Sequence, residues 1–305
     1  MPVDVVADTV EEFKQRIIRF MQPASAEITP ADLKFLPELT KTLPLGNAVY
    51  VAHTPAAGLE DIVRTSLAVQ QAGFAATPHI VGRRIPSALM LYKALQDLRA
   101  GGVDHLLLVA GDTEAPTGEF SSALDVLRSG VLEASGIWSI GVAGHPEGHP
   151  KVAASVLWDA LEVKQSFAAR CGMRMHVVTQ FGFDARAVCR WQQQLASHNI
   201  RLPVHVGIAG PTPLTKLFRF ALQCGIGASL RTVMRNANTV RTATDLAITP
   251  GQHLLRLLES APNAQLVAPH FFAFGGTLQT ARWIAQMARG QFELISADGQ
   301  FGLRT

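Results

Sequence analysis

The sequence predicts an α/β protein with the (β/α)8 TIM-barrel fold, folded as a single domain over residues 1–305. Short apolar segments of strand length alternate with longer amphipathic segments of helical spacing along the chain. Eight strand segments can be counted, and a helical segment follows each of them. Strict alternation implies parallel strands, and eight such units close a barrel. An open doubly wound sheet shares the alternation, but its Gly-x-Gly-x-x-Gly turn is missing after the first strand.

The chain is expected to begin with a helix that precedes the barrel, within residues 1–22. Apolar side chains recur at helical spacing between Asp8 and Met21, with Thr9 as a candidate cap. The strands are expected at 25–28, 47–53, 77–81, 105–110, 137–142, 175–180, 203–208 and 265–272. The helices are expected at 32–41, 59–72, 87–100, 120–134, 152–171, 185–198, 213–224 and 277–289, with one or two more inserted within 239–260.

Composition narrows the class of protein. Hydrophobic residues make up 48% of the chain and charged residues 17%, which is enough for a large core and shows no sign of disorder. The net charge is only +3 and no long basic run occurs, which argues against a nucleic-acid partner. If the basic residues serve binding, an anionic small molecule is the better match.

Cysteine usage and the N-terminal segment bear on the cellular compartment. Cys171, Cys189 and Cys224 are odd in number and widely separated, which fits neither a disulfide framework nor a zinc site. The N-terminal segment is rich in charge and lacks the apolar stretch of a signal peptide. No window approaches the roughly 20 apolar residues of a membrane helix. A cytoplasmic enzyme without a membrane partner is therefore expected.

If the barrel is correct, the active site lies at the C-terminal ends of the strands. That rule selects polar and glycine residues without reference to any family. The selected residues are Glu27, His53, His79, Gly111, Asp112, His145, His149, Gln180, Asp184 and the stretch 207–212.

The loop after the fifth strand, within residues 140–150, is the most unusual of these segments. Gly144 and Gly148 open conformations closed to other residues, while Pro146 and Pro150 restrict the backbone. His145 and His149 follow four residues apart and can exchange hydrogen bonds near neutral pH. The segment fits a binding site and equally a surface turn with solvated histidines. No further ligand accompanies the two histidines, so no metal site is predicted.

Four further residues have a functional and a structural interpretation. Asp112 could accept a hydrogen bond at the barrel mouth or cap a helix, and Gln180 could recognise a heterocycle edge or lie on the surface. Glu27 ends the first strand, where apolar walls would raise its pKa and keep it an acid, or it is a solvated glutamate. Phe220 could stack on an aromatic ring, although its position alone favours the core.

Taken together, the motifs resemble those of the methylenetetrahydrofolate reductase family. These are Gly111-Asp112 at strand four, the segment 140–150 with its Gly-His-Pro-Glu-Gly-His-Pro core, and Thr-Gln-Phe-Gly-Phe-Asp at 179–184. The likeness runs from about Glu27 to the last helix. It implies a TIM barrel that carries FAD and reduces 5,10-methylenetetrahydrofolate to 5-methyltetrahydrofolate with NAD(P)H. A role in one-carbon metabolism and methionine biosynthesis, in a homo-oligomer, would follow.

The resemblance also implies roles for individual residues. Glu27 matches the family's general acid, Asp112 a carboxylate near flavin and pterin, and Gln180 an amide that contacts pterin or nicotinamide. Phe220 matches a ring against which the substrate or NAD(P)H packs. The residues that match FAD contacts are His79, Gly111, Asp112, Phe120, His145, His149, Asp159 and Lys164. NAD(P)H and the folate would take turns at one flavin face, in a ping-pong reaction.

The chain departs from the family pattern at the expected phosphate and folate contacts. Lys164 is followed by Gln165 and Ser166 where the family carries a basic pair, so Arg83 and Arg84 become additional candidates for the FAD phosphates. The stretch 270–276 stands where the family has an Asn-Arg pair. These departures leave two alternatives open. One is a folate-binding methyl- or methylene-transfer protein without tightly bound FAD, and the other is a non-catalytic partner subunit.

Overall fold

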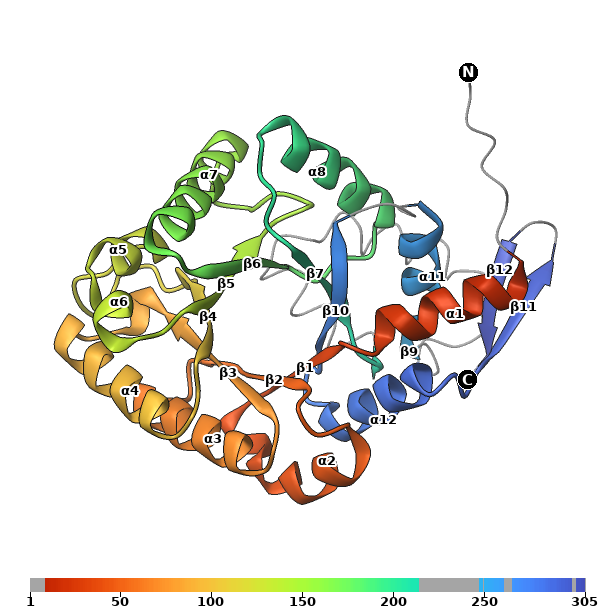
Figure 1. Cartoon of the computed structure of the whole chain (residues 1–305), viewed down its shortest axis with the longest axis horizontal. Helices are drawn as coiled ribbons and strands as arrows, with labels where there is room; N and C mark the ends of the chain where they lie inside the picture. The colour runs from red at the N-terminus through yellow and green to blue at the C-terminus, as the bar shows by residue number, and fades with distance from the viewer. Residues whose placement is uncertain (1–8, 214–246, 249, 261–264, 298–299, 305) are drawn as a thin grey trace.

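The structure, a computed structural model, describes residues 9–213, 247–248, 250–260, 265–297 and 300–304. Eight parallel strands form a closed barrel in the order β1-β10-β7-β6-β5-β4-β3-β2, and helices surround it (Figure 1). The predicted TIM-barrel fold is confirmed. The barrel strands are β1 Ser25–Ile28, β2 Ala48–Val51, β3 Ala75–Val81, β4 His105–Val109, β5 Ser139–Gly144, β6 Arg174–Thr179, β7 Val204–Ala209 and β10 Leu266–Phe272.

Each predicted strand is present within a few residues of its expected bounds. The α-helices are α1 Val10–Met21, α2 Leu36–Thr42, α3 Leu59–Gln71, α4 Ala88–Ala100, α5 Ala123–Arg128, α6 Val131–Ser135, α7 Ala154–Cys171, α8 Ala185–Ser197, α11 Pro250–Ser260 and α12 Thr277–Ala288. Two 3-10 helices, η1 Pro30–Phe35 and η2 Gly82–Arg84, complete the helical segments of the described residues. Among them, no helix is long and apolar enough to cross a membrane.

The N-terminal helix has the cap that its sequence predicts. The Thr9 hydroxyl accepts a hydrogen bond from Glu12 N–H at 3.2 Å, and the Glu12 carboxylate accepts one from Thr9 N–H at 2.8 Å. This reciprocal capping box satisfies two backbone donors that the first turn leaves open. Phe13 and Ile17 on the buried face of α1 lie in the core, where the helix packs against α12.

Three segments differ from the sequence prediction. The single helix expected at 120–134 is two helices, because Gly130 takes the left-handed conformation (φ 75°) between α5 and α6. The helix expected at 32–41 begins as η1, with Pro30 at its start and Pro37 in the first turn of α2. The helix expected at 213–224 lies almost wholly outside the described residues. Its first residue instead belongs to strand β8, Thr212–Pro213, which pairs with β9, Ala247–Ile248.

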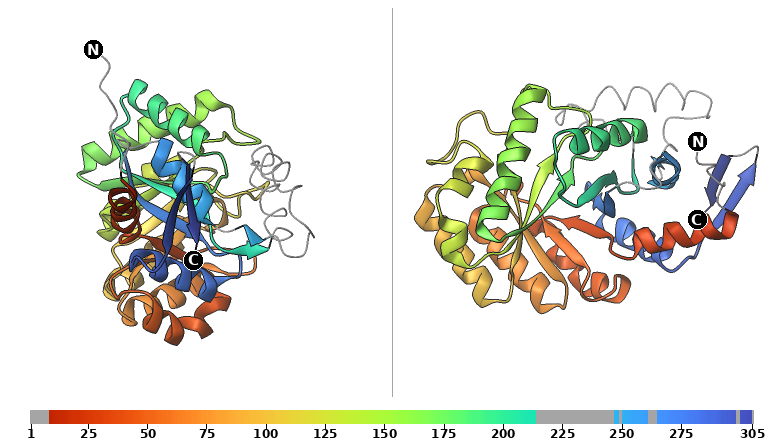
Figure 2. Two further views of the ribbon diagram at one scale, coloured as in Figure 1. Left: turned by 90° about the vertical axis from the view of Figure 1, so that its right-hand side faces the viewer. Right: turned by 45° about the horizontal axis from the view of Figure 1, so that its top comes forward.

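A C-terminal hairpin was not predicted. Strands β11, Glu293–Ala297, and β12, Gln300–Arg304, pair antiparallel next to α1, apart from the barrel (Figure 2). The sequence contains a hairpin signal for it, because an Asp-Gly pair separates the two segments.

The barrel separates an apolar outer core from a polar interior. Outward-facing strand residues such as Val49, Val51 and Ile80 pack with the helices in one large apolar cluster. The interior has only a small apolar cluster around Tyr50, Leu107 and Val178. By strand alternation, the remaining inward positions include Ser25, Glu27, Thr77, His79, His105, His176, His205 and His270. Branched aliphatic residues usually dominate this region of the fold.

Candidate functional site

Glu27 lies on β1 between two histidines of neighbouring strands. Its Oε2 atom is 3.7 Å from His79 Nε2 on β3 and 3.7 Å from His270 Nε2 on β10. The three side chains are 19%, 12% and 0% exposed, respectively. None of the three facing atoms has a hydrogen-bond partner among the described residues. Three buried polar atoms therefore face one another without hydrogen-bond partners. Such an arrangement destabilises the folded protein, so it indicates a functional site.

Burial sets the protonation states of this group. It raises the pKa of the Glu27 carboxyl, and the nearby His79 opposes that rise only in part. Burial lowers the pKa of His79 to about 4 and that of His270 to about 3. Desolvation disfavours the charged form of every group here, so a carboxylic acid faces two neutral imidazoles. Burial thus favours the protonated form of the Glu27 carboxyl, which is the form that can donate a proton.

Two more buried residues hold His270 in place. Ser25 Oγ lies 2.9 Å from His270 Nδ1, and the Tyr50 ring packs edge-on against the imidazole, with centroids 4.4 Å apart. The Tyr50 hydroxyl also lies 3.0 Å from His176 Nε2, and burial raises the pKa of Tyr50. Sequence reasoning did not select these residues. The detectable signal was the recurrence of histidine at inward positions of several predicted strands.

Asp112 lies at the rim, beyond the end of β4. Its carboxylate accepts a hydrogen bond from Arg84 at 2.9 Å, and its side chain is 82% exposed. Arg84 also donates to the His53 carbonyl, so it braces the loops after β2 and β4. Gly111 has φ +97°, and a Cβ atom there would overlap Val81 Cγ1. Only glycine therefore fits immediately before Asp112.

Gln180 directly follows β6. Its backbone N–H donates to the Gly144 carbonyl at 2.8 Å, and its side-chain Oε1 accepts from Phe181 N–H at 3.1 Å. Phe181 and Phe183 are buried, and Phe181 packs against Phe272 with centroids 5.5 Å apart. The two phenylalanines therefore pack beneath this strand end, and the backbone bond fixes Gln180 beside the loop after β5.

The loop after β5 is a tight turn rather than a solvated strand end. Gly148 N–H donates to the His145 carbonyl at 3.0 Å, with Pro146 second in the turn and Gly148 at φ +81°. The rings of His145 and His149 meet edge to face at 5.2 Å. Burial lowers the pKa of His145 to about 4, with His149 and Lys164 contributing, so His145 is neutral.

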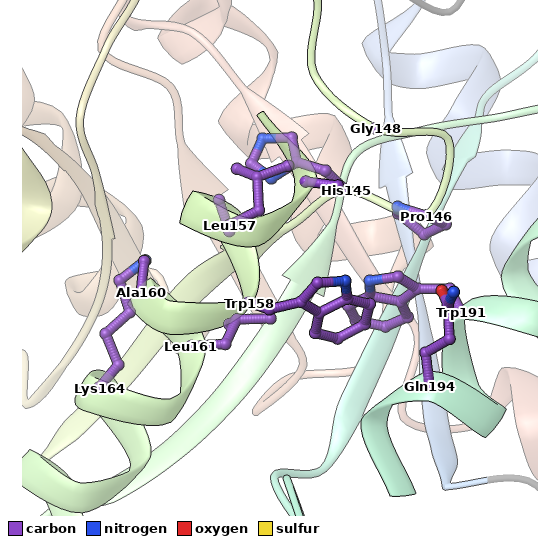
Figure 3. Close-up of a pocket in the computed structure, with 12 residues that line it drawn as sticks. His145, Pro146, Gly148, Leu157, Trp158, Ala160, Leu161, Lys164, Trp191 and Gln194 are labelled. Carbon is purple, nitrogen blue, oxygen red and sulfur yellow. The ribbon is translucent and has the colours of Figure 1, made fainter. Parts of the chain in front are cut away.

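A cavity of about 210 Å³ lies between this loop, α7 and α8 (Figure 3). The indole rings of Trp158 on α7 and Trp191 on α8 stack in it, 6.0 Å apart with an interplanar angle of 25°. Lys164 lines the same cavity, and no described residue accepts a hydrogen bond from its ammonium group or pairs with it. Burial lowers the pKa of Lys164 to about 8. Two aromatic faces and a buried, unpaired cation suit a planar group attached to an anion.

The other residues selected from sequence are not gathered at this cavity. Asp159 is exposed on α7 and does not line it, and Phe120 is 3% exposed within the outer core. Phe220 lies outside the described residues. Arg83 donates to the carbonyls of Ser121 and Thr113, which ties it to the segment after β4.

Gln165 has a structural role that explains one departure in sequence. Its amide NH2 group donates to the Asn199 carbonyl at 2.9 Å, and its Oε1 accepts from Arg201 N–H at 2.6 Å. This side chain joins α7 to the connection before β7 and has no charge to offer a phosphate. Within the described part of the chain, no group of three His, Cys, Asp or Glu could hold a metal ion.

The fold and this rim define a TIM-barrel protein with a protonatable carboxyl where such barrels carry their active sites. The family model described as methylenetetrahydrofolate reductase matches residues 44–246, which is more than half of the chain. The chain belongs to the methylenetetrahydrofolate reductase family.

A curated relative and two solved structures give the measure of similarity. The chain is 26% identical over 157 residues to a 5,10-methylenetetrahydrofolate reductase of Pectobacterium carotovorum subsp. carotovorum, covering 52% of this chain and 51% of that protein. It thus spans about half the length of that relative. Dihydropteroate synthase from Thermus thermophilus is 12% identical, with a TM-score of 0.49 over 87% of this chain and 92% of that one. Triosephosphate isomerase from Bartonella henselae is 10% identical, with a TM-score of 0.45 over 88% and 99%.

Proposed function

We propose that this chain reduces 5,10-methylenetetrahydrofolate to 5-methyltetrahydrofolate, with NAD(P)H as reductant and FAD as the hydride carrier. The observation that carries the proposal is Glu27, a buried carboxyl with a raised pKa at the barrel rim, in a chain of this family. Overall, one NAD(P)H and one proton are consumed for each methylene group reduced to methyl.

Glu27 would supply the proton. Opening the methylene-bridged ring breaks a carbon–nitrogen bond, and the departing nitrogen must be protonated before the iminium carbon can accept hydride. A carboxyl that is still an acid near neutral pH can make this transfer, whereas an ordinary solvated glutamate is ionised there. His79 and His270 would then face the carboxylate that remains, each able to offer an N–H without carrying charge.

The cavity beside the β5 loop fits the nucleotide half of FAD. Trp158 and Trp191 offer aromatic faces for a planar heterocycle, and Lys164 offers a buried ammonium group for a phosphate. Neutral His145 and His149 would hydrogen-bond to the cofactor nearby. When bound, FAD would accept hydride from NAD(P)H and pass it to the folate.

Asp112 and Gln180 would recognise the bound ring systems. Asp112, paired with Arg84 at the edge of the mouth, would accept hydrogen bonds from a pterin. Gln180 presents both a donor and an acceptor for a pterin or nicotinamide amide. Phe220 would pack against the same ligands. A shared set of contacts implies alternating occupancy, and therefore ping-pong kinetics.

One observation favours a second function, folate-linked methyl or methylene transfer without tightly bound FAD. Gln165 occupies the place of a second base and is committed to backbone groups, as is Arg83, while Arg84 is shared between the His53 carbonyl and the Asp112 carboxylate. Lys164 is then the only cation among the described residues that lines the candidate phosphate cavity.

A spectroscopic experiment separates the two. Protein purified with added FAD should retain a yellow chromophore after gel filtration, lose its absorbance with NAD(P)H, and regain it with methylenetetrahydrofolate. Protein that remains colourless, binds the folate and leaves NAD(P)H unoxidised would support the transfer function instead.

A further inference from the structure

The barrel interior contains a connected set of polar rings below Glu27. His176 and His205 stack with centroids 4.4 Å apart, and the Tyr50 hydroxyl lies 3.0 Å from His176 Nε2. Tyr50 in turn contacts His270. Burial lowers the pKa of His176 to about 3, and electrostatic interaction with His205 and then with His105, which is 37% exposed at the start of β4, adds to the shift. The rings thus extend from the N-terminal opening of the barrel toward the proposed acid.

His270 is the ring best placed to exchange protons with Glu27. Its Nε2 faces the Glu27 carboxyl and its Nδ1 faces Ser25 Oγ. A hydroxyl can donate or accept, so the imidazole can carry its proton on either nitrogen. With Nε2–H, His270 donates to a Glu27 carboxylate. With Nδ1–H, its Nε2 accepts from a Glu27 carboxylic acid. Both states of Glu27 therefore have a matching tautomer.

The other groups facing Glu27 are less suited to this exchange. His79 is equally close to the carboxyl, but its ring centroid is 6.0 Å from that of Tyr50, whereas the centroid of His270 is 4.4 Å from it. His53 acts on His79 only through its charge. His270, by contrast, is fully buried and is in electrostatic contact with both His176 and His205.

The proposed reaction requires Glu27 to be recharged in every turnover. The proton it gives to the departing nitrogen leaves in the product, and a buried carboxylate remains. A ligand over the C-terminal rim covers the direct path to solvent on that side. The missing proton must come from water, either through the mouth after product release or through the interior.

We propose that His270, oriented by Ser25, returns this proton to Glu27, and that Tyr50, His176 and His205 connect it to water at the N-terminal opening. The inference rests on the proposed role of Glu27. As the His270 Nε2–H bond breaks, an O–H bond forms on Glu27, and Nδ1 takes the proton of the Ser25 hydroxyl, which regains one from water in the interior. The imidazole then turns over, so that an N–H faces Glu27 again before the next turnover. One proton enters from water for each proton lost to product, and the 3.7 Å separation shortens when the carboxylate forms.

First-turnover and steady-state rates distinguish this route from a merely structural role. Because burial favours the protonated form of Glu27 before the first turnover, His270→Gln should leave the first reduction of methylenetetrahydrofolate within about twofold of wild type. Its steady-state kcat should fall by at least about tenfold, because glutamine can hydrogen-bond to Glu27 but cannot relay a proton. Added imidazole buffer should restore part of that loss. Tyr50→Phe and Ser25→Ala should show the same split to a smaller extent.

The matched control is His253→Gln, which removes a buried, neutral histidine of α11 outside the barrel interior. It should change neither rate. Equal losses in both phases for His270→Gln, or no loss in either phase, would overturn the relay. Ser25→Ala removes only a hydroxyl and keeps the test valid if the glutamine variant folds poorly. A wild-type protein that never reduces the folate would instead refute the proposed function.

Discussion

Lys164 provides a direct test of the candidate cofactor cavity. Because its ammonium group is buried, the free energy by which it destabilises the folded protein can be worked out from the shift in its pKa. Its pKa falls from 10.5 to about 8, a change of about 2.5 units. At 1.36 kcal/mol per unit, the buried ammonium group destabilises the folded protein by about 3 kcal/mol at neutral pH. Lys164→Met keeps the stem of the side chain and removes the charge. The variant should therefore be more stable than wild type, by up to about 3 kcal/mol at pH 7.

The stability difference between Lys164→Met and wild type should depend on pH. The folded pKa of Lys164 lies below the unfolded one, so the penalty is complete below about pH 8, where both states are protonated. It fades as pH rises from about 8 to 10.5, where the folded lysine has lost its proton and the unfolded lysine still binds one. Urea unfolding of both proteins at pH 7 and pH 9.5 should show an advantage of the variant that falls by about half. An equal or lower stability of Lys164→Met at pH 7 would mean that the ammonium group has a partner in the folded protein, and the reasoning would fail.

The same variant tests why the charge is retained. ADP or FAD should raise the melting temperature of wild type and leave Lys164→Met nearly unchanged, because the phosphate would lose its buried cation. Gln194→Met, at another residue that lines the cavity, is the matched control and should keep the ligand response. A ligand-induced shift of equal size in both variants would place the phosphates elsewhere.

Three further predictions concern the rim and the cavity beside the β5 loop. Glu27→Gln should leave flavin reduction by NAD(P)H unchanged but lower the rate of folate reduction by roughly 10²–10⁴-fold, measured as separate half-reactions; survival of both excludes Glu27 as the acid. Gly111→Ala should cost about 2 kcal/mol in urea unfolding, from positive φ and overlap with Val81, and a Val81→Ala partner should recover part of it. Trp158→Ala should weaken FAD binding about tenfold or more in a fluorescence titration, because a stacking face is lost; unchanged affinity would move the nucleotide out of this cavity.

The barrel could be predicted from sequence because its strongest signals are local. Alternation of β and α segments and helix-closing glycines depend on neighbouring residues, and every predicted strand is present. The failures are also instructive. Gly130 interrupts a helix that apolar spacing alone would continue, and the β11–β12 hairpin was overlooked despite its Asp-Gly pair.

The candidate site was only partly accessible to sequence reasoning. Glu27, Asp112 and Gln180 could be placed at the rim because strand ends are readable in a sequence. The pairing of Ser25 with His270 could not, since it joins residues 245 positions apart through the closure of β1 onto β10. Likewise, the commitment of Gln165 to Asn199 and Arg201 depends on how α7 meets the segment before β7. Register across a closed barrel is a tertiary property, so side-chain partners appear only in the structure.

The polar interior makes a last prediction about acid stability. Burial lowers the pKa of His79 and His205 to about 4 and that of His176 and His270 to about 3. In the unfolded chain, each titrates near 6.5. Between these values the unfolded state binds more protons, so stability is lost as pH falls, by about 1.4 kcal/mol per pH unit for each histidine.

Glu27 acts in the opposite direction, because its raised pKa makes the folded state bind the extra proton, and that contribution is lost as pH rises. Four histidines against one glutamate leave a net fall in stability on acidification from about pH 6.5 to pH 4. Urea unfolding at pH 5, 6 and 7 measures it. His205→Gln should reduce the slope by about 1.4 kcal/mol per pH unit, since one proton-binding difference is removed. A wild-type stability that is flat over this range would mean that the interior imidazoles already carry charge, and both the acid role of Glu27 and the relay through His270 would lose their electrostatic basis.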